Sequence, residues 1–359
     1  MKNKIKVLAL TRYGALGASS RMRFLQYLPA LAAAGIEIEV QSLFDDATLS
    51  SKYQQGNYGL ATVLQCFAKR ISIMRKRQSF DLLWIEKEAL PWWPLWLEKS
   101  MLQGIPYILD YDDAWFHNYD LHRLKIVRQL FGRRLDELMA NATLVIGGNG
   151  YLTQRAQNAG APWVEVLPTV IDLVRYPTPQ LKYKIDTIPT VVWIGSPSTI
   201  RYLQILHKPL QQLAQRIPFQ LRVIGGEIVI PGVNVHCLPW SEDTEVENIA
   251  SADVGVMPLL DSPWERGKCG YKLIQYMACG LPVVASPIGV NTEIVRADVN
   301  GYLASNANDW VYALEKLLLD VDLRKQMGQM GRQRVEQEYC LQVAAPQLEA
   351  WLKRVAVES

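Results

Sequence analysis

The sequence predicts an α/β protein with two domains, each built on a parallel β-sheet. Three observations lead to this class. Short apolar runs alternate with segments of helical spacing along the chain, an order typical of parallel sheets covered by helices. The alternation is interrupted once, in a segment that contains Pro168, Pro177, Pro179 and Pro189. A chain of 359 residues is also longer than one ordinary hydrophobic core accommodates.

The first half of the sequence alternates regularly between strands and helices. Strands are predicted where apolar and β-branched residues dominate, at residues 5–10, 36–40, 80–86, 107–110, 143–148 and 164–168. Helices are predicted at residues 20–34, 60–77, 120–140 and after Gly150. We therefore assign residues 1–170 to a first domain.

The second half repeats the pattern after a segment without a clear period. We assign that segment, residues 171–189, to a linker and residues 190–340 to a second domain. Strands are predicted at residues 190–195, 220–226, 233–240, 253–259, 281–286 and 301–304, and helices at 198–217, near Glu245, and at 273–278, 308–320, 323–340 and 341–357. In such a protein the cleft between the domains is the expected ligand site, beyond the carboxyl ends of the strands.

The composition excludes several classes of protein. The net charge of +3 is too small to indicate a nucleic-acid partner. The five cysteines lack metal-ligand spacing, which fits reduced thiols in a cytoplasm. No apolar run reaches the roughly 18 residues of a membrane span, and the first apolar run is too short for a signal peptide. Residues 1–170 hold 20 Lys and Arg against 15 Asp and Glu, which fits an anionic membrane surface or an ordinary solvated face.

Two candidate site segments lie in the first domain. In "GALGASSRMR", Gly14 and Gly17 allow a tight turn whose N–H groups approach an anion or sugar, although a purely structural turn has the same pattern. In "YILDYDDAWFH", carboxylates follow a strand at Asp110, Asp112 and Asp113. Carboxylates in this arrangement bind sugar hydroxyls, assist proton transfer or bind a metal, and we do not expect a metal.

A third candidate segment, "WIGSPSTIRYL", opens the second domain. A strand ends at Gly195, and Ser196 offers a hydroxyl just before a predicted helix. Arg201 falls in the first turn of that helix, where it opposes the helix dipole. An Arg at this position fits a bound phosphate, or alternatively a surface ion pair.

The fourth candidate segment is "ERGKCGYK", directly before the apolar helix "LIQYMA". Gly267 and Gly270 allow a loop with converging N–H groups, and Lys268 and Lys272 add two positive charges. A diphosphate fits this combination. Cys269, between the lysines, has no histidine nearby in the sequence and is interpreted as a small packed residue.

Two further segments allow alternative interpretations. Trp92, Trp93 and Trp96 in "ALPWWPLWLEKSML" fit an interfacial membrane helix, a contact to a lipid acceptor, or a buried helix. The basic segment "AKRISIMRKR", residues 68–77, fits contact with anionic headgroups or a solvated helix face. Peripheral contact with an anionic membrane therefore remains one expectation.

The C-terminal half resembles a known family. The segments "SADVGVMPL", "GYKLIQYMACGLPVVASPIGVNTEIV", "NGYLA" and "MGQMGRQRVEQEY" resemble the donor-binding domain of glycosyltransferase family four, and "GALGASSRMRFLQYLPALAAAGIEIEV" resembles its first strand–helix unit. The resemblance implies the GT-B architecture, two Rossmann-like domains facing across a cleft. It also implies a final helix, residues 341–359, that crosses back to the first domain, a donor site on the second domain and an acceptor site on the first.

The sequence departs from the family's two-glutamate motif. Aligned on "QYMACG", the second glutamate falls on Gln275, which would hold the donor ribose, and the first falls on Gly267. Glu265 or Lys268 is expected to compensate. The pattern G-K-C-G-x-K-L-x-Q-Y resembles a variant subgroup of these enzymes. The family's N-terminal histidine also has no match, so Asp112 or Asp113 is expected to orient the sugar.

Together with the cysteine pattern, the resemblance indicates a cytoplasmic retaining glycosyltransferase without a metal or other cofactor, and peripheral membrane contact is one alternative for it. It would move a sugar from a nucleotide-sugar donor to a glycan, lipid-linked or small-molecule acceptor. Ser196, Arg201, Lys268, Gly270 and Lys272 would bind the donor, and Gly17 would let its loop close over the diphosphate. The alternatives are a nucleotide-sugar-binding protein without catalysis and a GT-B nucleotide-sugar epimerase.

Overall fold

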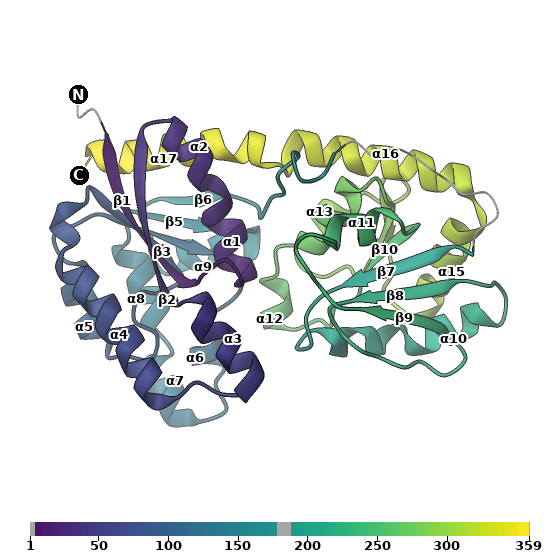
Figure 1. The fold of residues 1–359 in the computed structure, drawn as a ribbon, viewed down its shortest axis with the longest axis horizontal. Helices are drawn as coiled ribbons and strands as arrows, with labels where there is room; N and C mark the ends of the chain where they lie inside the picture. Colours follow the sequence, from purple (N-terminus) through teal and green to yellow (C-terminus); the bar gives the residue numbers. More distant parts are fainter. Residues whose placement is uncertain (1–3, 178–187, 359) are drawn as a thin grey trace. The chain divides into compact units, whose positions relative to one another are not determined.

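The computed structural model describes residues 4–177 and 188–358, and it divides into two compact units (Figure 1). Unit 1 comprises Met1–Thr169 and Ala344–Ser359, and unit 2 comprises Val170–Val343. Each unit contains one six-stranded parallel sheet. The predicted fold class, two α/β domains with parallel sheets, is therefore confirmed.

Unit 1 has the strand order β2-β1-β3-β4-β5-β6. Its strands are β1 (Ile5–Tyr13), β2 (Ile36–Phe44), β3 (Leu82–Glu86), β4 (Tyr107–Tyr111), β5 (Leu144–Gly147) and β6 (Val164–Val166). The chain winds outward in both directions from β1, which pairs with β2 and with β3. The loops after β1 and β3 therefore leave at the point where the winding reverses, which is where open α/β sheets bind ligands.

The helices of unit 1 are shorter than the sequence predicts. They are α1 (Ala18–Arg23), η1 (Leu25–Tyr27), α2 (Leu28–Ala33), α3 (Asp46–Gln55), α4 (Leu60–Arg75), η2 (Arg77–Ser79), α5 (Leu95–Leu102), α6 (His117–Asp120), α7 (Lys125–Phe131), α8 (Arg134–Asn141), α9 (Gly150–Asn158) and the unit 1 part of α17 (Leu341–Glu358). The single helix predicted over 120–140 is in fact three, and one of the breaks falls at Gly132, a residue with low helix propensity.

Unit 2 has the strand order β12-β11-β10-β7-β8-β9. Its strands are β7 (Thr190–Ile194), β8 (Gln220–Ile224), β9 (Asn234–Leu238), β10 (Val254–Met257), β11 (Val283–Ala285) and β12 (Gly301–Leu303). Its helices are η3 (Ile200–Leu206), α10 (His207–Ala214), α11 (Glu245–Ala250), α12 (Pro263–Arg266), α13 (Tyr271–Ala278), α14 (Asn291–Ile294), α15 (Ala307–Leu319) and α16 (Val321–Glu338). Here the winding reverses between β7 and β10.

The central strand β7 shows why unit 2 forms a sheet covered on both faces. Its residues alternate between two hydrophobic clusters, with Val191 and Trp193 in one and Val192 and Ile194 in the other. All four side chains are buried. Alternate residues of a strand point to opposite faces, so a continuous apolar run such as "TVVWI" predicts helices on both sides.

The predicted linker is packed into unit 2 where the structure describes it. Ile171 pairs with Cys340, and Tyr176 is buried against Ile274 and its neighbours in the core. Residues 178–187 lie outside the described residues. None of the helices in the described ranges is long and apolar enough to cross a membrane.

Two segments differ in burial from one of their predicted alternatives. Arg70, in the basic segment of α4, is buried, and it donates hydrogen bonds to the carbonyl oxygens of Gln41 at 3.0 Å and Ala89 at 3.1 Å. The prediction of a lipid-facing or solvated basic segment is therefore wrong for Arg70, because backbone acceptors at the sheet edge draw the guanidinium inward. Conversely, Trp92 and Trp96 are 45% and 71% exposed, so the buried-helix alternative is wrong for these two.

Candidate functional site

The unit 2 candidate site begins directly after β7, at the reversal of the winding. The backbone at Gly195 passes so close to Trp193 that an added Cβ would lie 2.3 Å from the indole ring. The following turn is closed by its own polar groups, since the Ser196 N–H donates to Thr199 Oγ1 at 3.0 Å. The Ser196 hydroxyl is exposed and lies 2.9 Å from the Ser198 hydroxyl.

Arg201 and Glu265 meet through Tyr202. The Tyr202 hydroxyl donates to Glu265 Oε1 at 2.6 Å and accepts from Arg201 at 3.2 Å. The Arg201 guanidinium is 61% exposed and lies 3.5 Å from the same carboxylate oxygen. Burial opposes ionisation of Glu265, but hydrogen bonds from Ser262 and Tyr202 and the charge of Lys268 hold its pKa below the usual value. Glu265 is thus an ionised carboxylate that pairs with Arg201 and lies within the field of Lys268.

Lys272 is the most unusual charge in unit 2. It lies in the first turn of α13, and its Nζ is 4.7 Å from the centre of the Trp193 ring. Burial, together with the charge of Lys268, lowers the pKa of Lys272 to about 7. In the part of the chain that the structure describes, no carboxylate lies within ion-pair distance of its Nζ. This position therefore favours a bound anion, which would restore the proton.

Gly270 fixes the backbone that brings the two lysines together. It is the N-cap of α13 and has φ +65°, in the left-handed region that favours glycine. A Cβ here would lie 2.3 Å from Ile294 Cδ1. Gly267 ends the short helix α12, so the loop of residues 267–270 runs directly from α12 into α13.

Gln275 lies inside unit 2 rather than at the loop. It is 3% exposed, and its Nε2 donates to the Tyr176 hydroxyl at 2.9 Å. Tyr176 in turn donates to Glu245 at 3.1 Å, and Trp240 donates to the same carboxylate at 2.8 Å. The structure therefore links Gln275 to a buried hydrogen-bonded chain that begins in the predicted linker.

The unit 1 candidate site is centred on Lys87, which the sequence analysis did not single out. Lys87 follows β3, and its Nζ lies 2.8 Å from Asp112 Oδ1 and 3.6 Å from Glu86 Oε1. Burial opposes the charge of Lys87, but these carboxylates raise its pKa. Burial likewise opposes ionisation of Asp112, but Lys87 holds the pKa of Asp112 below its usual range. Charged residues directly after the buried run "LLWI" were the signal for this site.

The three candidate aspartates have different environments. Asp110 is buried and accepts from Arg23 Nε at 2.8 Å and from Trp84 Nε1 at 3.3 Å. It is therefore part of an internal ion pair with Arg23, which is also buried. Asp112 is bound to Lys87, while Asp113 is half-buried and contributes to the high pKa of Lys87.

The loop between Gly14 and Gly17 already holds a carboxylate. The N–H groups of Ala15 and Leu16 donate to the Asp46 carboxylate at 3.1 Å and 2.9 Å. Gly17 is buried, and a Cβ there would lie 2.3 Å from Tyr13 Cβ. In the described structure the donors of this turn are therefore occupied by the side chain of Asp46, and binding of an external anion here stays a prediction.

Two units of this type, each a six-stranded parallel sheet whose winding reverses beside its first strand, define the GT-B fold. The chain is similar in fold to HepE of Anabaena, solved in complex with UDP, with a TM-score of 0.72 and 17% identity over 98% of this chain and 100% of that one. It is also similar in fold to sucrose-phosphate synthase of Thermosynechococcus elongatus, with a TM-score of 0.73 and 17% identity over 99% of this chain and 100% of that one.

The family match lies in unit 2. Residues 188–320 match the family Glycosyl transferases group 1. The chain is also 32% identical to D-inositol 3-phosphate glycosyltransferase of Paenarthrobacter aurescens (strain TC1) over 108 residues, 30% of this chain. This match spans a quarter of the length of that relative. These findings support the predicted glycosyltransferase family, and the G-K-C-G-x-K subgroup stays a prediction.

Proposed function

We propose that the protein is a retaining glycosyltransferase that uses a nucleotide-sugar donor and a glycan, lipid-linked or small-molecule acceptor. The observation that carries the proposal is the group Arg201, Lys268 and Lys272 at the carboxyl edge of the unit 2 sheet, with Glu265 as its nearest carboxylate. A group with more cations than acids fits a diphosphate. The similar Anabaena protein HepE was solved with UDP and with UDP-glucose.

In the proposed reaction, the cations stabilise the leaving group. The bond between the anomeric carbon and the diphosphate oxygen breaks, and its electron pair remains on the diphosphate. The acceptor oxygen bonds to the anomeric carbon on the same face, and its proton passes to the leaving phosphate oxygen. Arg201, Lys268 and Lys272 offset the charge that develops there.

The remaining residues have supporting roles in this proposal. Gly270 holds the loop that presents the lysines, and the Ser196 hydroxyl binds phosphate. Gln275, whose Nε2 donates a hydrogen bond to the Tyr176 hydroxyl, contacts the ribose. On unit 1, Asp112 or Asp113 orients the donor sugar, and the loop at Gly17 binds the diphosphate. No metal or other cofactor takes part, so activity is expected to be unchanged by a chelator.

The test is calorimetric titration of the full chain with UDP, GDP and ADP. Arg201→Ala and Lys268→Ala are each expected to weaken binding of the preferred diphosphate about tenfold or more, since a charge-assisted bond contributes about 1.5–3 kcal/mol. Arg216→Ala is the matched control, because Arg216 is an exposed arginine of unit 2 that also pairs with a glutamate. Unchanged affinity in both site variants would refute the proposed donor site.

A second measurement separates the proposal from its alternatives. A panel of nucleotide sugars, with cell-extract acceptors, is expected to give transfer with retained anomeric configuration, which NMR of the product detects. Binding without hydrolysis or transfer would favour a nucleotide-sugar-binding protein, and conversion of the donor to its epimer would favour an epimerase. We also propose a cytoplasmic location with peripheral membrane contact.

A further inference from the structure

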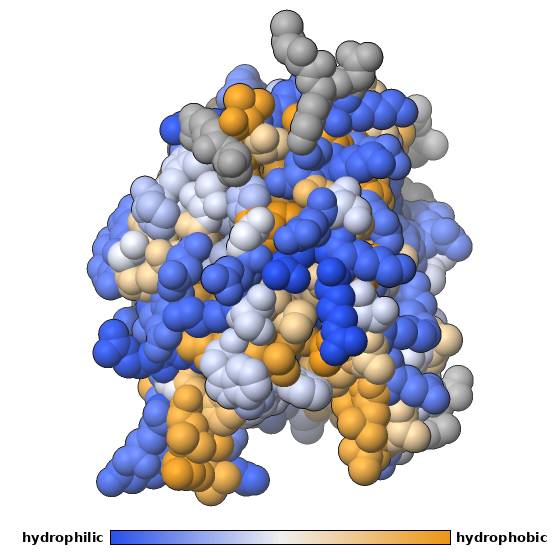
Figure 2. Space-filling view, turned by 90° about the vertical axis from the view of Figure 1, so that its left-hand side faces the viewer, coloured by the Kyte–Doolittle hydropathy of each residue, from blue (hydrophilic) through white to orange (hydrophobic). Residues whose placement is uncertain are grey.

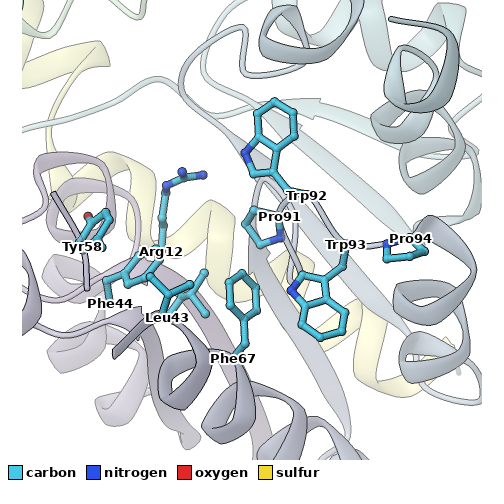
Figure 3. A pocket seen from close by; sticks show the side chains of 10 residues that line it. Arg12, Leu43, Phe44, Tyr58, Phe67, Pro91, Trp92, Trp93 and Pro94 are labelled. Carbon is cyan, nitrogen blue, oxygen red and sulfur yellow. The ribbon is translucent and has the colours of Figure 1, made fainter. Parts of the chain in front are cut away.

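Unit 1 contains a cavity of about 530 Å³ that the proposed donor site does not use. It opens at the carboxyl edge of the sheet, where β1, β2 and β3 end (Figure 3). The lining is dominated by rings and aliphatic side chains: Arg12, Leu43, Phe44, Tyr58, Val63, Phe67, Pro91, Trp92, Trp93 and Pro94. A cavity of this size and character is typical of a binding site for an apolar group.

Arg12 is the charged member of the lining. Its guanidinium stacks 4.0 Å from the centre of the Trp115 ring, and its Nε donates to the Tyr13 hydroxyl at 3.3 Å. Within residues 4–177 and 188–358, no carboxylate lies within ion-pair distance of the guanidinium. Figure 3 shows the side chain between Tyr58 on one side and Pro91 and Trp92 on the other. The cavity therefore combines apolar walls with a cation that has no carboxylate partner among the described residues.

The cavity wall at Trp92 has a strained backbone. Trp92 has φ +66°, a conformation that is unfavourable for a bulky residue and common at functional sites. Its N–H donates to the Tyr119 hydroxyl at 3.2 Å, and its ring packs edge-on against Tyr119 and Phe131. The surrounding structure thus holds this indole in place at the opening, although 45% of it remains exposed.

Helix α4, which contributes Val63 and Phe67 to the lining, and helix α5, which follows Pro94, also expose apolar side chains. Leu60 and Leu64 at the start of α4 are 75% and 57% exposed, and Trp96 at the start of α5 is 71% exposed. Figure 2, which faces the left-hand side of Figure 1, shows hydrophobic projections at the lower edge of that face. Nearby, Phe131 belongs to α7, which exposes Ile126 and Leu130 beside Lys125 and Arg128. Exposed apolar residues mixed with cations fit an anionic lipid interface.

We propose that this cavity binds an anionic amphiphile of the prenyl phosphate type, with the hydrocarbon chain against the rings and the phosphate on Arg12. The charge of Arg12 selects an anionic head, and the lining supplies few hydroxyl-binding groups for a glycan. The exposed leucines and Trp96 provide an apolar path for the chain from a membrane. The role of this ligand as the acceptor rests on the proposed function. The binding of the ligand in the cavity does not depend on that function.

The test uses the full chain with farnesyl phosphate below its critical micelle concentration, followed by tryptophan fluorescence and calorimetry. Farnesyl phosphate is expected to bind at least tenfold more tightly than farnesol, and inorganic phosphate is expected not to bind at the same concentrations. Arg12→Gln should remove the preference for farnesyl phosphate over farnesol. Val63→Glu, which places a charge in the half-buried wall, should weaken both ligands at least tenfold.

Matched controls lie on the exposed surface of α4. Lys69→Gln removes a cation, and Gln65→Glu adds an acid, both outside the lining, and both should leave farnesyl phosphate binding unchanged. The proposal is wrong if farnesyl phosphate does not bind, or if Arg12→Gln and Val63→Glu bind it like the unmodified protein.

The two proposals fail in different ways. UDP affinity should be the same in Arg12→Gln and Val63→Glu as in the unmodified protein, which also reports that these variants are folded. If the donor-site proposal is wrong, Arg201→Ala and Lys268→Ala will bind UDP as tightly as the unmodified protein does. Farnesyl phosphate binding without any binding of UDP, GDP or ADP would leave the cavity assigned and the glycosyltransferase function refuted.

Discussion

The two units share a topology but balance their charges differently. At the edge of the unit 1 sheet, Lys87 is paired with Asp112 and Glu86 at 2.8 Å and 3.6 Å. At the corresponding edge of unit 2, Lys272 lies over an indole ring with no such carboxylate among the described residues. Burial acts on both lysines, yet the pKa of Lys87 is raised and that of Lys272 is lowered.

The difference between the two lysines is the reverse of what the distribution of charge along the sequence suggests. Residues 1–170 carry the excess of cations, with 20 Lys and Arg against 15 Asp and Glu, whereas the rest of the chain holds 18 against 20. The cation most in need of an external anion is nevertheless in unit 2. Net charge therefore says little about a site, because pairing at the strand ends decides which charges remain available.

The largest expected effect breaks the balanced site. Lys87→Met leaves Asp112 and Glu86 buried without their cation, so the free energy of unfolding should fall by about 3–5 kcal/mol. Urea denaturation measures this change. A loss below about 1 kcal/mol would show that the unit 1 charges are hydrated rather than internally paired.

The same substitution in unit 2 should have the opposite consequence. Lys272→Met removes a half-buried cation without a carboxylate partner, so stability should be unchanged or higher, while UDP binding should weaken by about 1.5–3 kcal/mol. Denaturation and calorimetry of this variant form a matched pair with Lys87→Met. A destabilised Lys272→Met with normal UDP affinity would contradict the comparison.

A pH titration sharpens the assignment of Lys272. Its pKa in the free protein is lowered to about 7, and a bound diphosphate raises it again. UDP affinity should therefore be full below pH 7 and fall as pH rises through 7 toward 9, by at most about tenfold per pH unit. By the same linkage, the unliganded protein should gain stability over that range, since the unfolded lysine still binds its proton.

The control for this titration is Lys272→Met, which retains any pH dependence that comes from the nucleotide itself. The difference between the pH profiles of UDP affinity for the unmodified protein and for Lys272→Met gives the contribution of the Lys272 ammonium. A difference that does not change between pH 6 and pH 9 would show that the Lys272 ammonium keeps its proton in the free protein.

The smallest expected effect concerns the loop at Gly14 and Gly17. Asp46→Ala frees the N–H groups of Ala15 and Leu16, so UDP affinity should rise severalfold, about 0.5–1.5 kcal/mol, if this loop binds the diphosphate. Asp45→Asn removes the same charge from the neighbouring residue and can still cap α3. Equal affinities for the two variants would assign the loop a purely structural role.

The sequence predicted the elements better than their contacts. The strand assignments at "TVVWI" and "LLWIE" agree with β7 and β3, because buried parallel strands need continuous apolar runs. The long helix over 120–140 was wrong, since a single apolar period does not reveal where buried charges interrupt a surface helix. Arg134, just after the break, is buried with Glu88 and Glu98.

The candidate sites were predicted as residue types and positions along the chain. The lysines around Gly270 and the aspartates after β4 were evident because glycine, lysine and aspartate at strand ends suit anions and sugars. Lys87 was missed, and so was the chain from Gln275 to Tyr176, which joins residues 99 positions apart. Such contacts depend on which strands are neighbours in the sheet. Local spacing in the sequence does not indicate the order of the strands.

The sequence by itself determined two α/β units and the charged residues at the ends of their strands, because periodicity and turn chemistry are local properties. Only the tertiary structure decided which charges are neutralised. It paired Lys87 with Asp112 across adjacent strands and placed Lys272 over Trp193, since the free energy of a buried charge depends on the atoms that folding brings within a few ångströms of it.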